Sequence, residues 1–430
     1  MRLCVGGYLT QVSSGRAQGQ RPGLLDSLPE RTTIANLSHG TARKMTYAQG
    51  RTFYDADSHI MELPDFLKDH ADPRLRERMP KIQVPRVGPL ANLLEEAQAR
   101  RGHSAERVAE LTALGDGLIS GPKGYGALGA FNAAERSAAL DLLGFHRQLV
   151  FATFSPGPAF SEQRPIEDRY AAARAHNRAM GEFTSGDERL MGVALLPLDV
   201  TSLALAELDH ILELDLKAVW IPHRPCGGRS PGHTDLDPVW ARLAQARIPF
   251  LLHVGGHPLQ LSAEWMNTGR KIPTDWLGGG ENVRGKDMTS LHQPAETFIG
   301  AMVLDGVLER HRDLRGGVIE LGAGWVPQML ARLDWVAEIW KKSEPELAAL
   351  TRKPSEQIVD QLAFTPYVYE NVGALIKQSD PRLYLFSSDY PHTEGGRQPL
   401  GRFEASLKDA SESEKTRFYS GNFARLFEVA

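Results

Sequence analysis

Cysteine is scarce in this chain, which contains only Cys4 and Cys226 among its 430 residues. Two thiols cannot form the disulfide framework of a small secreted domain, so we expect a reducing, cytoplasmic location. No hydrophobic run reaches the ~18 residues that a membrane-spanning helix needs. Positive charge is not in excess either, since 49 basic side chains face 53 acidic ones and the net charge is −4. These absences argue against a membrane or nucleic-acid partner and favour a small-molecule substrate.

The first 44 residues differ from the rest of the chain. The stretch SSGRAQGQRPGLLDSLPERTTIANLSHGTARK is rich in Ser, Gly, Arg and Thr and has no sustained periodicity. The preceding LCVGGYL is too short and too broken by glycine to be the apolar core, roughly 7–15 residues, of a secretory signal. We therefore expect a mobile arm at 1–44 and a single domain over 45–430. A second interpretation is that Met45 is the natural start.

From about residue 52, short apolar runs alternate with amphipathic helical patterns, which is typical of parallel β/α architecture. The apolar runs predict eight strands, at 52–59, 148–154, 190–198, 217–222, 249–256, 288–294, 316–324 and 383–392. The helical patterns lie at 166–184, 235–247, 293–311, 325–342 and 414–429. Eight strands alternating with helices predict a (β/α)8 TIM barrel. The wide gap at 60–147 predicts a helical or loop-rich insertion after the first strand, and 343–380 predicts a second insertion.

Several predicted strands end in groups that can bind a metal or move protons. In a (β/α)8 barrel, catalytic groups lie at the C-terminal ends of the strands. The first run ends in Asp57-Ser58-His59, and because strand side chains alternate, Asp57 and His59 point the same way. The later runs carry His253 in the fifth, His292 in the sixth, Glu320 in the seventh and Asp389 in the eighth.

Two carboxylates and two imidazoles from distant parts of the sequence thus converge on one point. This set suits one divalent cation, Zn²⁺ in preference to Mn²⁺, without any thiolate ligand. The single residues permit simpler interpretations. A histidine such as His253 after an apolar strand is usually a hydrogen-bonded core residue, and Asp389 alone could cap a helix. Only their joint placement favours a metal site.

Other residues are candidates for supporting roles. We expect Asp55 to pack structurally or to orient a ligand, and Glu62 to assist from the following loop. His257 and Glu320 are candidates for contact with the substrate or with the ligands. Arg224 and Arg229, just beyond the fourth predicted strand, could bind a substrate carboxylate, although a solvated arginine explains each equally well.

Six segments carry a resemblance to a known family. They are DADSHIME, NRAMGEFTSGDERLMGVALLPL, FLLHVGG, LERHRDLRGGVIELGAGWVPQMLARLD, SSDYPH and GNFARLF, in this order over roughly residues 50 to 430. Together they resemble the amidohydrolase-2 family, the branch of the amidohydrolase superfamily that includes aminocarboxymuconate-semialdehyde decarboxylase and γ-resorcylate decarboxylase. The resemblance implies a distorted (β/α)8 barrel, one divalent metal, no organic cofactor and a homodimer.

The resemblance also implies roles by position. Asp57 and His59 resemble the first-strand ligand pair, which is His-x-His or Glu-x-His in the best-known members, so the Asp-x-His pair is a departure. His253 resembles the fifth-strand ligand and Asp389 the eighth-strand ligand. His292 resembles the sixth-strand histidine that hydrogen-bonds the metal-bound water or the substrate.

Two reactions stay open. The first is metal-dependent, cofactor-free decarboxylation of an aromatic or unsaturated carboxylic acid, with Asp389 or His292 delivering a proton to the carbon that loses CO2. The second is hydrolysis of an ester, amide, lactone or C–C bond by a metal-activated water, with Asp389 taking the proton. A purely structural metal is disfavoured, because a barrel mouth is open to water. We favour the decarboxylase because the resemblance points to that branch; the fold alone would not.

Overall fold

Seven parallel strands form one sheet in the computed structural model, in the order of the sequence from β1 to β7. The structure describes residues 46–84, 89–258, 261–271 and 283–429, so the arm predicted at 1–44 lies outside the described residues. The strands are β1 (Tyr54–Asp55), β2 (Arg147–Val150), β3 (Leu190–Leu195), β4 (Ala218–Trp220), β5 (Phe250–His253), β6 (Gly316–Ile319) and β7 (Leu362–Phe364). Each strand pairs with the next in parallel, which requires a crossover connection between them.

The chain from Leu383 to Tyr390 runs between the two edge strands of this sheet. Leu385 N donates to Phe364 O at the β7 edge (2.9 Å), and Ala56 N, just after β1, donates to Phe386 O (3.0 Å). Single parallel bridges also pair Phe364 with Tyr384 and Ser58 with Tyr390. The sheet therefore curves until both of its edges contact the same segment.

The strand predicted at 288–294 is wrong. The 3-10 helix η5 (Asp287–Thr289) and the start of α10 (Gln293–Leu304) occupy this segment. Pro294 lies in the first turn of α10, where its fixed φ and missing N–H are tolerated. The strand that sequence reasoning missed is β7, which lies inside the segment predicted as an insertion at 343–380. The other six strands overlap predicted runs.

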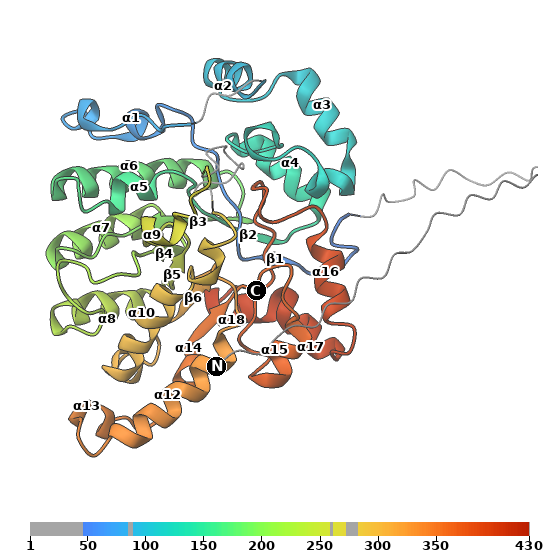
Figure 1. Ribbon diagram of the computed structural model, residues 1–430. Coiled ribbons are helices and arrows are strands. Elements are labelled where there is room, and N and C mark those ends of the chain that lie inside the picture. The colour runs from blue at the N-terminus through green and yellow to red at the C-terminus, as the bar shows by residue number, and fades with distance from the viewer. Residues whose placement is uncertain (1–45, 85–88, 259–260, 272–282, 430) are drawn as a thin grey trace, which may run out of the picture. The chain divides into compact units, whose positions relative to one another are not determined.

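Helices occupy the connections and lie outside the sheet. Figure 1 shows α6, α7, α8 and α10 on one side of the strands and α15, α16 and α17 on the other, with α2, α3 and α4 grouped at the top of the view. Between β1 and β2 lie α1 (Phe66–His70), α2 (Pro89–Arg100), α3 (Ala105–Ala113) and α4 (Ala133–Leu143). The next helices are α5 (Pro156–Phe160), α6 (Ile166–Thr184), α7 (Thr201–Glu213), α8 (Asp237–Ala246), α9 (Ala263–Met266) and α11 (Val307–Arg310). The last are α12 (Val326–Trp340), α13 (Pro345–Ala348), α14 (Pro354–Gln361), α15 (Val372–Gln378), α16 (Pro399–Ser406), α17 (Glu412–Thr416) and α18 (Asn422–Phe427).

Local sequence signals explain several helix ends. The Ser104 hydroxyl accepts from Arg107 N at the start of α3, and the Asn132 side chain accepts from Glu135 N at the start of α4. Such caps satisfy backbone donors that the first turn leaves unpaired. Gly144 ends α4 with φ of +76°, a conformation that glycine adopts without a side-chain penalty. Among the described helices, none is long and apolar enough to cross a membrane.

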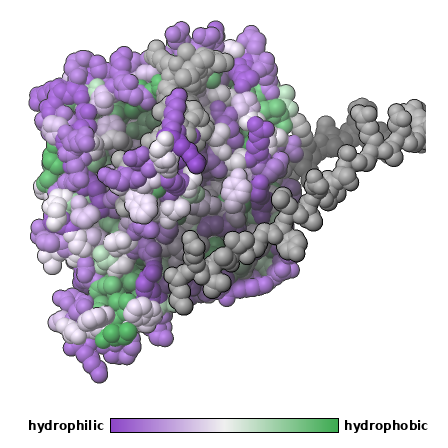
Figure 2. Space-filling model, viewed as in Figure 1, coloured by the Kyte–Doolittle hydropathy of each residue, from purple (hydrophilic) through white to green (hydrophobic). Residues whose placement is uncertain are grey.

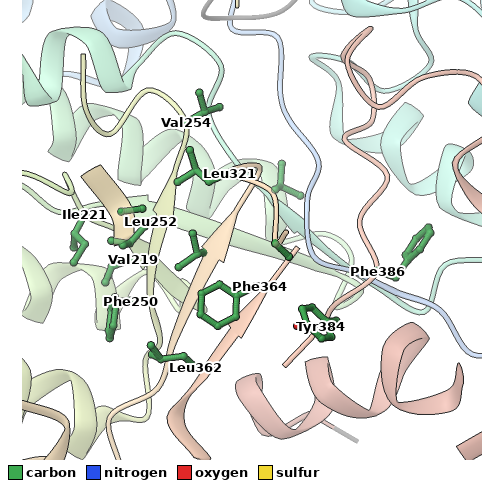
Figure 3. Close-up of a cluster of buried hydrophobic side chains, with 14 of the residues drawn as sticks. Val219, Ile221, Phe250, Leu252, Val254, Leu321, Leu362, Phe364, Tyr384 and Phe386 are labelled. Carbon is green, nitrogen blue, oxygen red and sulfur yellow. The ribbon is translucent and has the colours of Figure 1, made fainter. Parts of the chain in front are cut away.

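The two faces of the sheet bury two separate hydrophobic clusters. The face under the helices includes Val219, Phe250, Leu252, Leu362 and Phe364, shown with Tyr384 and Phe386 in Figure 3. The inner cluster alternates with these residues along the strands and includes Leu149, Met191, Val193, Ala218, Leu251, Ile319, Ala363 and Leu385, with Phe423 and Leu426 of α18. Because side chains alternate along a strand, an inner residue such as Leu251 places His253 on the same inner face. The outer surface seen in Figure 2 is mostly hydrophilic, with hydrophobic residues in a few patches.

Candidate metal centre

Four side chains from three strand ends gather on the inner face. Asp57, His59, His253 and Glu320 each offer one ligand atom, and these atoms all lie within 4.8 Å of one another. His253 Nε2 is 3.3 Å from Asp57 Oδ1 and 3.3 Å from Glu320 Oε2. His59 Nε2 is 3.3 Å from Asp57 Oδ1 and 3.6 Å from Asp389 Oδ1. We call these five residues the metal cluster.

Backbone conformation brings Glu320 into the metal cluster. Strict alternation after the inner residue Ile319 would direct Glu320 toward the helices. Its φ of +55° breaks the extended conformation and turns the carboxylate inward. Asp389 also has a positive φ, of 51°. Such conformations are uncommon for residues other than glycine and concentrate at functional sites.

The two imidazoles in the cluster are oriented by backbone carbonyls. His59 Nδ1 lies 2.8 Å from Ala152 O, and His253 Nδ1 lies 2.9 Å from Val254 O. A carbonyl oxygen can only accept, so in each ring Nδ1–H donates and Nε2 carries the lone pair. Metal-binding histidines are commonly fixed in this way. Both Nε2 atoms point toward the carboxylates of the cluster.

Burial sets the charges of the cluster. It lowers the pKa of His59 to about 3, and the nearby His392 adds to this effect, so the His59 ring is neutral. Burial acts to raise the pKa of Asp57, but the positive charge and hydrogen bonds that His253 and His59 provide when their rings are protonated outweigh burial and lower that pKa. For Asp389, burial and the carboxylate of Asp57 together raise the pKa, despite the opposing contact with His392. Neutral imidazoles and an ionised Asp57 are the forms that bind a metal.

The donor atoms fit a divalent cation. His59 Nε2 and both carboxylate oxygens of Asp389 are buried and form no hydrogen bond with any residue in the described part of the chain. A buried polar atom without a partner is costly, and like-charged carboxylates in one place repel. One bound cation would remove both costs. The cluster therefore suits a single divalent metal ion, held by carboxylate and imidazole groups.

Buried polar side chains support the cluster from behind. Asp55 accepts from Ser388 N (2.8 Å), Ser388 Oγ (2.6 Å) and Gln148 Nε2 (2.8 Å), next to Asp389. This fits the interpretation of Asp55 as an orienting group. Arg136 of α4 donates to the carbonyl of His59 and, over 3.1 Å, to Gln148 Oε1. These bonds tie the end of β1 to the segment that carries Asp389.

Sequence reasoning missed His392, although the SSDYPH motif contains it. Its ring joins a second group of ligand atoms with His59 and Asp389. His392 Nδ1 is 3.2 Å from Asp389 Oδ1, and His392 Nε2 is 2.9 Å from Thr153 Oγ1. The available signal was its spacing of three residues from Asp389.

Glu62 lies outside the cluster, where its carboxylate accepts from the backbone N–H of residues 153–155, including Thr153.

A cavity of about 330 Å³ opens onto the cluster. Asp57, Glu320 and Asp389 form part of its wall, next to apolar and aromatic side chains. The latter are Val254, Val283, Met288, Leu291, Tyr367, Val368 and Tyr369. A cavity with convergent polar groups and apolar walls is the usual form of a small-molecule site.

The structure separates two predicted histidines from the cluster. His292 precedes α10 and stacks on Trp325, with ring centroids 5.7 Å apart, and is not among the described residues that line the cavity. Its placement at a sixth-strand end was wrong, because that segment is helical. The group after β6 is Glu320. His257 lies 5.8 Å from the ring of His223, and the two line a different cavity.

Both predicted arginines are occupied by protein partners. Arg224 donates to Glu162 Oε1 (2.8 Å) and to Phe160 O (3.0 Å). Arg229 donates to Thr201 Oγ1 (3.1 Å) and to Asp199 O (2.8 Å). These bonds fix the loop after β4. Neither arginine lines the cavity beside the cluster.

Comparisons with solved structures show similar folds. An amidohydrolase from Mycobacterium avium subsp. paratuberculosis K-10 is 22% identical, with a TM-score of 0.66 over 88% of this chain and 99% of that one. The 2,6-dihydroxybenzoate decarboxylase from Rhizobium is 16% identical, with a TM-score of 0.57 over 88% and 99%. The 5-carboxyvanillate decarboxylase from Novosphingobium aromaticivorans, solved with bound manganese, is 14% identical, with a TM-score of 0.60 over 90% and 99%.

No curated protein matches the sequence. These three solved structures are below 25% identity, so they establish the fold alone. The sequence pattern of the amidohydrolase family matches residues 126–429. This match covers more than half of the chain and contains His253, Glu320 and Asp389. The chain belongs to the amidohydrolase family of enzymes.

Proposed function

We propose that this enzyme is a metal-dependent, non-oxidative decarboxylase of an aromatic or unsaturated carboxylic acid. One observation carries the proposal: the metal cluster forms one wall of a cavity whose other walls are largely apolar and aromatic. Such a cavity suits a flat, mainly apolar acid with its polar groups at one end. The similar folds of decarboxylases that act on 2,6-dihydroxybenzoate and 5-carboxyvanillate support this choice.

Asp57, His59, His253, Glu320 and Asp389 would hold the metal. When bound, the cation would supply positive charge to hold the carboxylate of the acid and an adjacent oxygen. Glu320 and Asp57 lie on the cavity wall, where they would set the position of that charge. The apolar wall, including Val254 and Leu291, would exclude water from the face of the ring.

Asp389 is the proposed proton donor. Its carboxyl group lies on the cavity wall, where general acid catalysis of this reaction needs a proton donor. The carboxyl group gives its proton to the carbon that bears the substrate carboxylate. The bond between that carbon and the carboxylate then breaks, its electron pair restores the double bond of the ring, and CO2 leaves. We assign no proton transfer to His292, which is stacked on Trp325 instead.

The donor set bears on the choice of metal. The sequence predicted Zn²⁺, with Mn²⁺ as the second choice. With Glu320 in the cluster, three carboxylates accompany two imidazoles, and oxygen-rich sites favour Mn²⁺ more than nitrogen-rich sites do. We therefore propose Mn²⁺ as a resident metal. The manganese in the 5-carboxyvanillate decarboxylase structure supports this proposal.

Product analysis tests the reaction. Purified enzyme loaded with Mn²⁺ is incubated with 2,6-dihydroxybenzoate, 5-carboxyvanillate and related aromatic acids, and CO2 release is measured beside an Asp389→Asn control. Release of CO2 that Asp389→Asn abolishes supports the proposal. Turnover of esters, amides or lactones instead, with oxygen from isotopically labelled water in the product, would establish the hydrolase alternative.

Two finer features of architecture belong with this proposal. We propose that the segment 383–390 acts as the eighth strand of a distorted barrel, supported by its hydrogen bonds to β7 and β1.

We also propose that the enzyme is a homodimer that buries one face of α12. Trp335, Ile339 and Trp340 of this helix are 54%, 58% and 49% exposed. Large apolar side chains exposed together commonly mark an interface.

A further inference from the structure

Lys123 lies in the loop between the 3-10 helices η2 (Gly115–Ser120) and η3 (Gly124–Gly126), in the connection from β1 to β2. This loop runs along the segment that carries Asp389. Gly124 N donates to Pro391 O (2.8 Å), and the Ser120 hydroxyl donates to Arg397 O. Lys123 Nζ lies 5.9 Å from the centre of the Tyr390 ring, which neighbours Asp389 in sequence. The loop therefore holds a cation against the segment that carries Asp389.

The ammonium group of Lys123 is buried and forms no hydrogen bond with any described residue. Removing an ammonium from water without a paired anion costs several kcal/mol. Burial lowers the pKa of Lys123 to about 8, while the charges of Asp389 and Glu394 oppose that shift. The cation–π contact with Tyr390 compensates for only part of the burial cost. A buried, unpaired cation of this kind is typical of a functional site.

The cavity that opens onto the metal cluster is strongly acidic. Its wall carries the carboxylates of Asp57, Glu320, Glu370, Asp389 and Glu394, and no lysine or arginine is among the described residues that line it. Glu370 is stabilised by the backbone N–H of residues 323, 324 and 367. An organic acid brings a further negative charge into this cavity. A divalent metal compensates for two of these charges, so repulsion of the acid remains.

We propose that Lys123 is a positioning residue for an anionic substrate, whose buried positive charge beside Asp389 and Glu394 draws the carboxylate of an organic acid into the cavity. The proposal rests on the proposed function in one respect, that the substrate is an acid. It extends that function by naming Lys123, a residue of the β1–β2 connection, as the group that attracts the negatively charged acid. The charge of Lys123 interacts with those of Asp389 and Glu394, and both of these residues line the cavity.

A positive charge at this place has opposite effects on the two kinds of ligand. It attracts an anion to the cavity and repels a cation from the metal cluster. Removing it should therefore weaken anion binding while leaving metal binding unchanged or tighter. Local unfolding of the loop would instead weaken both. This difference in sign separates an electrostatic role from a structural one.

The experiment measures two affinities by calorimetry in the full-length protein. The first is that of Mn²⁺ for the metal-free protein, and the second is that of salicylate, with uncharged salicylamide as its comparison, for the Mn²⁺-loaded protein. The variants are Lys123→Met, which keeps the length without the charge, and Lys123→Arg, which keeps the charge. Arg397→Gln is the matched control, because Arg397 is a neighbouring but exposed cation, screened by solvent.

We expect Lys123→Met to weaken salicylate binding about tenfold, the size of a Coulomb interaction across roughly 12 Å at an effective dielectric constant of ~20. Binding of salicylamide and Mn²⁺ should not weaken. Lys123→Arg should preserve the preference for salicylate, and Arg397→Gln should have little effect.

Three results would overturn the proposal. They are an unchanged salicylate preference in Lys123→Met, a parallel loss of Mn²⁺ and salicylate affinity, or no preference for salicylate over salicylamide in the unmodified protein. The proposed decarboxylation fails separately, through the absence of CO2 release. A salicylate preference that depends on Lys123 would stand even if the enzyme proved to be a hydrolase of anionic substrates.

Discussion

The imidazole rings of His59 and His392 stack with their centroids 3.9 Å apart and their planes inclined by 22°. His59 follows β1 and His392 follows the segment 383–390 that contacts both sheet edges, so the contact joins the end of β1 to the end of that segment. One ring presents Nε2 to the metal cluster, while the Nδ1 of the other lies 3.2 Å from Asp389 Oδ1 and its Nε2 lies 2.9 Å from Thr153 Oγ1. The stack therefore couples a candidate metal ligand to the proposed proton donor.

Replacing His392 by Phe tests this coupling. His392→Phe keeps a stacking ring but removes both nitrogen contacts, so we expect metal content near that of the unmodified enzyme and CO2 release reduced about 10–100-fold. Metal analysis and turnover are measured on the same preparation. Thr153→Val, which removes only the partner hydroxyl, should have a smaller effect. Loss of the metal from His392→Phe would instead make His392 a ligand.

Replacing His253 by Ala should remove the metal. His253 Nε2 lies within 3.3 Å of two carboxylates, and its loss leaves those carboxylates with one imidazole fewer to share the cation. We expect about one equivalent of metal in the unmodified protein by elemental analysis and a substoichiometric amount in His253→Ala. His257→Ala is the matched control, since His257 is four residues away and outside the cluster, and it should retain the metal. Equal metal content in all three proteins would contradict the site.

Glu320→Gln tests the carboxylate that follows β6. The amide keeps the shape but loses the negative charge that a cation requires, so we expect Mn²⁺ affinity to fall about 10–100-fold. Glu394→Gln removes a carboxylate from the same cavity but outside the cluster and should change Mn²⁺ affinity much less. Similar losses in the two variants would indicate a general charge effect and argue against ligation by Glu320.

His176 should make stability depend on pH. Its Nε2–H donates to Val193 O (3.1 Å), and burial lowers its pKa from 6.5 to about 4. Between these values the unfolded chain binds a proton that the folded chain does not, so stability falls as pH falls from 6.5 toward 4. The loss from this group is about 2 kcal/mol between pH 7.5 and 5. Urea unfolding at both pH values should give a smaller decrease for His176→Gln, and an equal decrease would refute the assignment.

Trp335→Asp should disrupt the proposed dimer. Trp335 is 54% exposed on α12, one helical turn before Ile339, so both side chains present the same face. A charge placed in an apolar interface costs desolvation energy without a partner. Light scattering should show a dimer for the unmodified enzyme and a monomer for Trp335→Asp, with unchanged circular dichroism. A monomer in both cases would refute the dimer, while leaving the metal site unaffected.

Periodicity and residue type were sufficient for much of this protein. Alternating apolar runs located six of the seven strands, and the helix expected at 166–184 is α6 with those bounds. Asp57, His59, His253 and Asp389 were predicted to meet because each follows an apolar run, and the structure brings them together. These features depend on local patterns, which a single sequence contains.

The remaining features depend on contacts between distant segments. The three-residue strand β7 is too short to give a periodic signal. The apolar run that contains His292 is not a strand, because α10 begins directly after His292, with Pro294 in its first turn. Glu320 enters the cluster through a left-handed backbone conformation, against the alternation of its strand. His392 contacts His59, and Lys123 contacts Tyr390, only when the segment that contains Tyr390 and His392 packs against the end of β1 and the β1–β2 connection. The sequence alone thus determined that Asp57, His59, His253 and Asp389 are candidate metal ligands at strand ends, because these patterns are local. Only the tertiary structure decided which groups surround that site, because their positions depend on how segments hundreds of residues apart pack together.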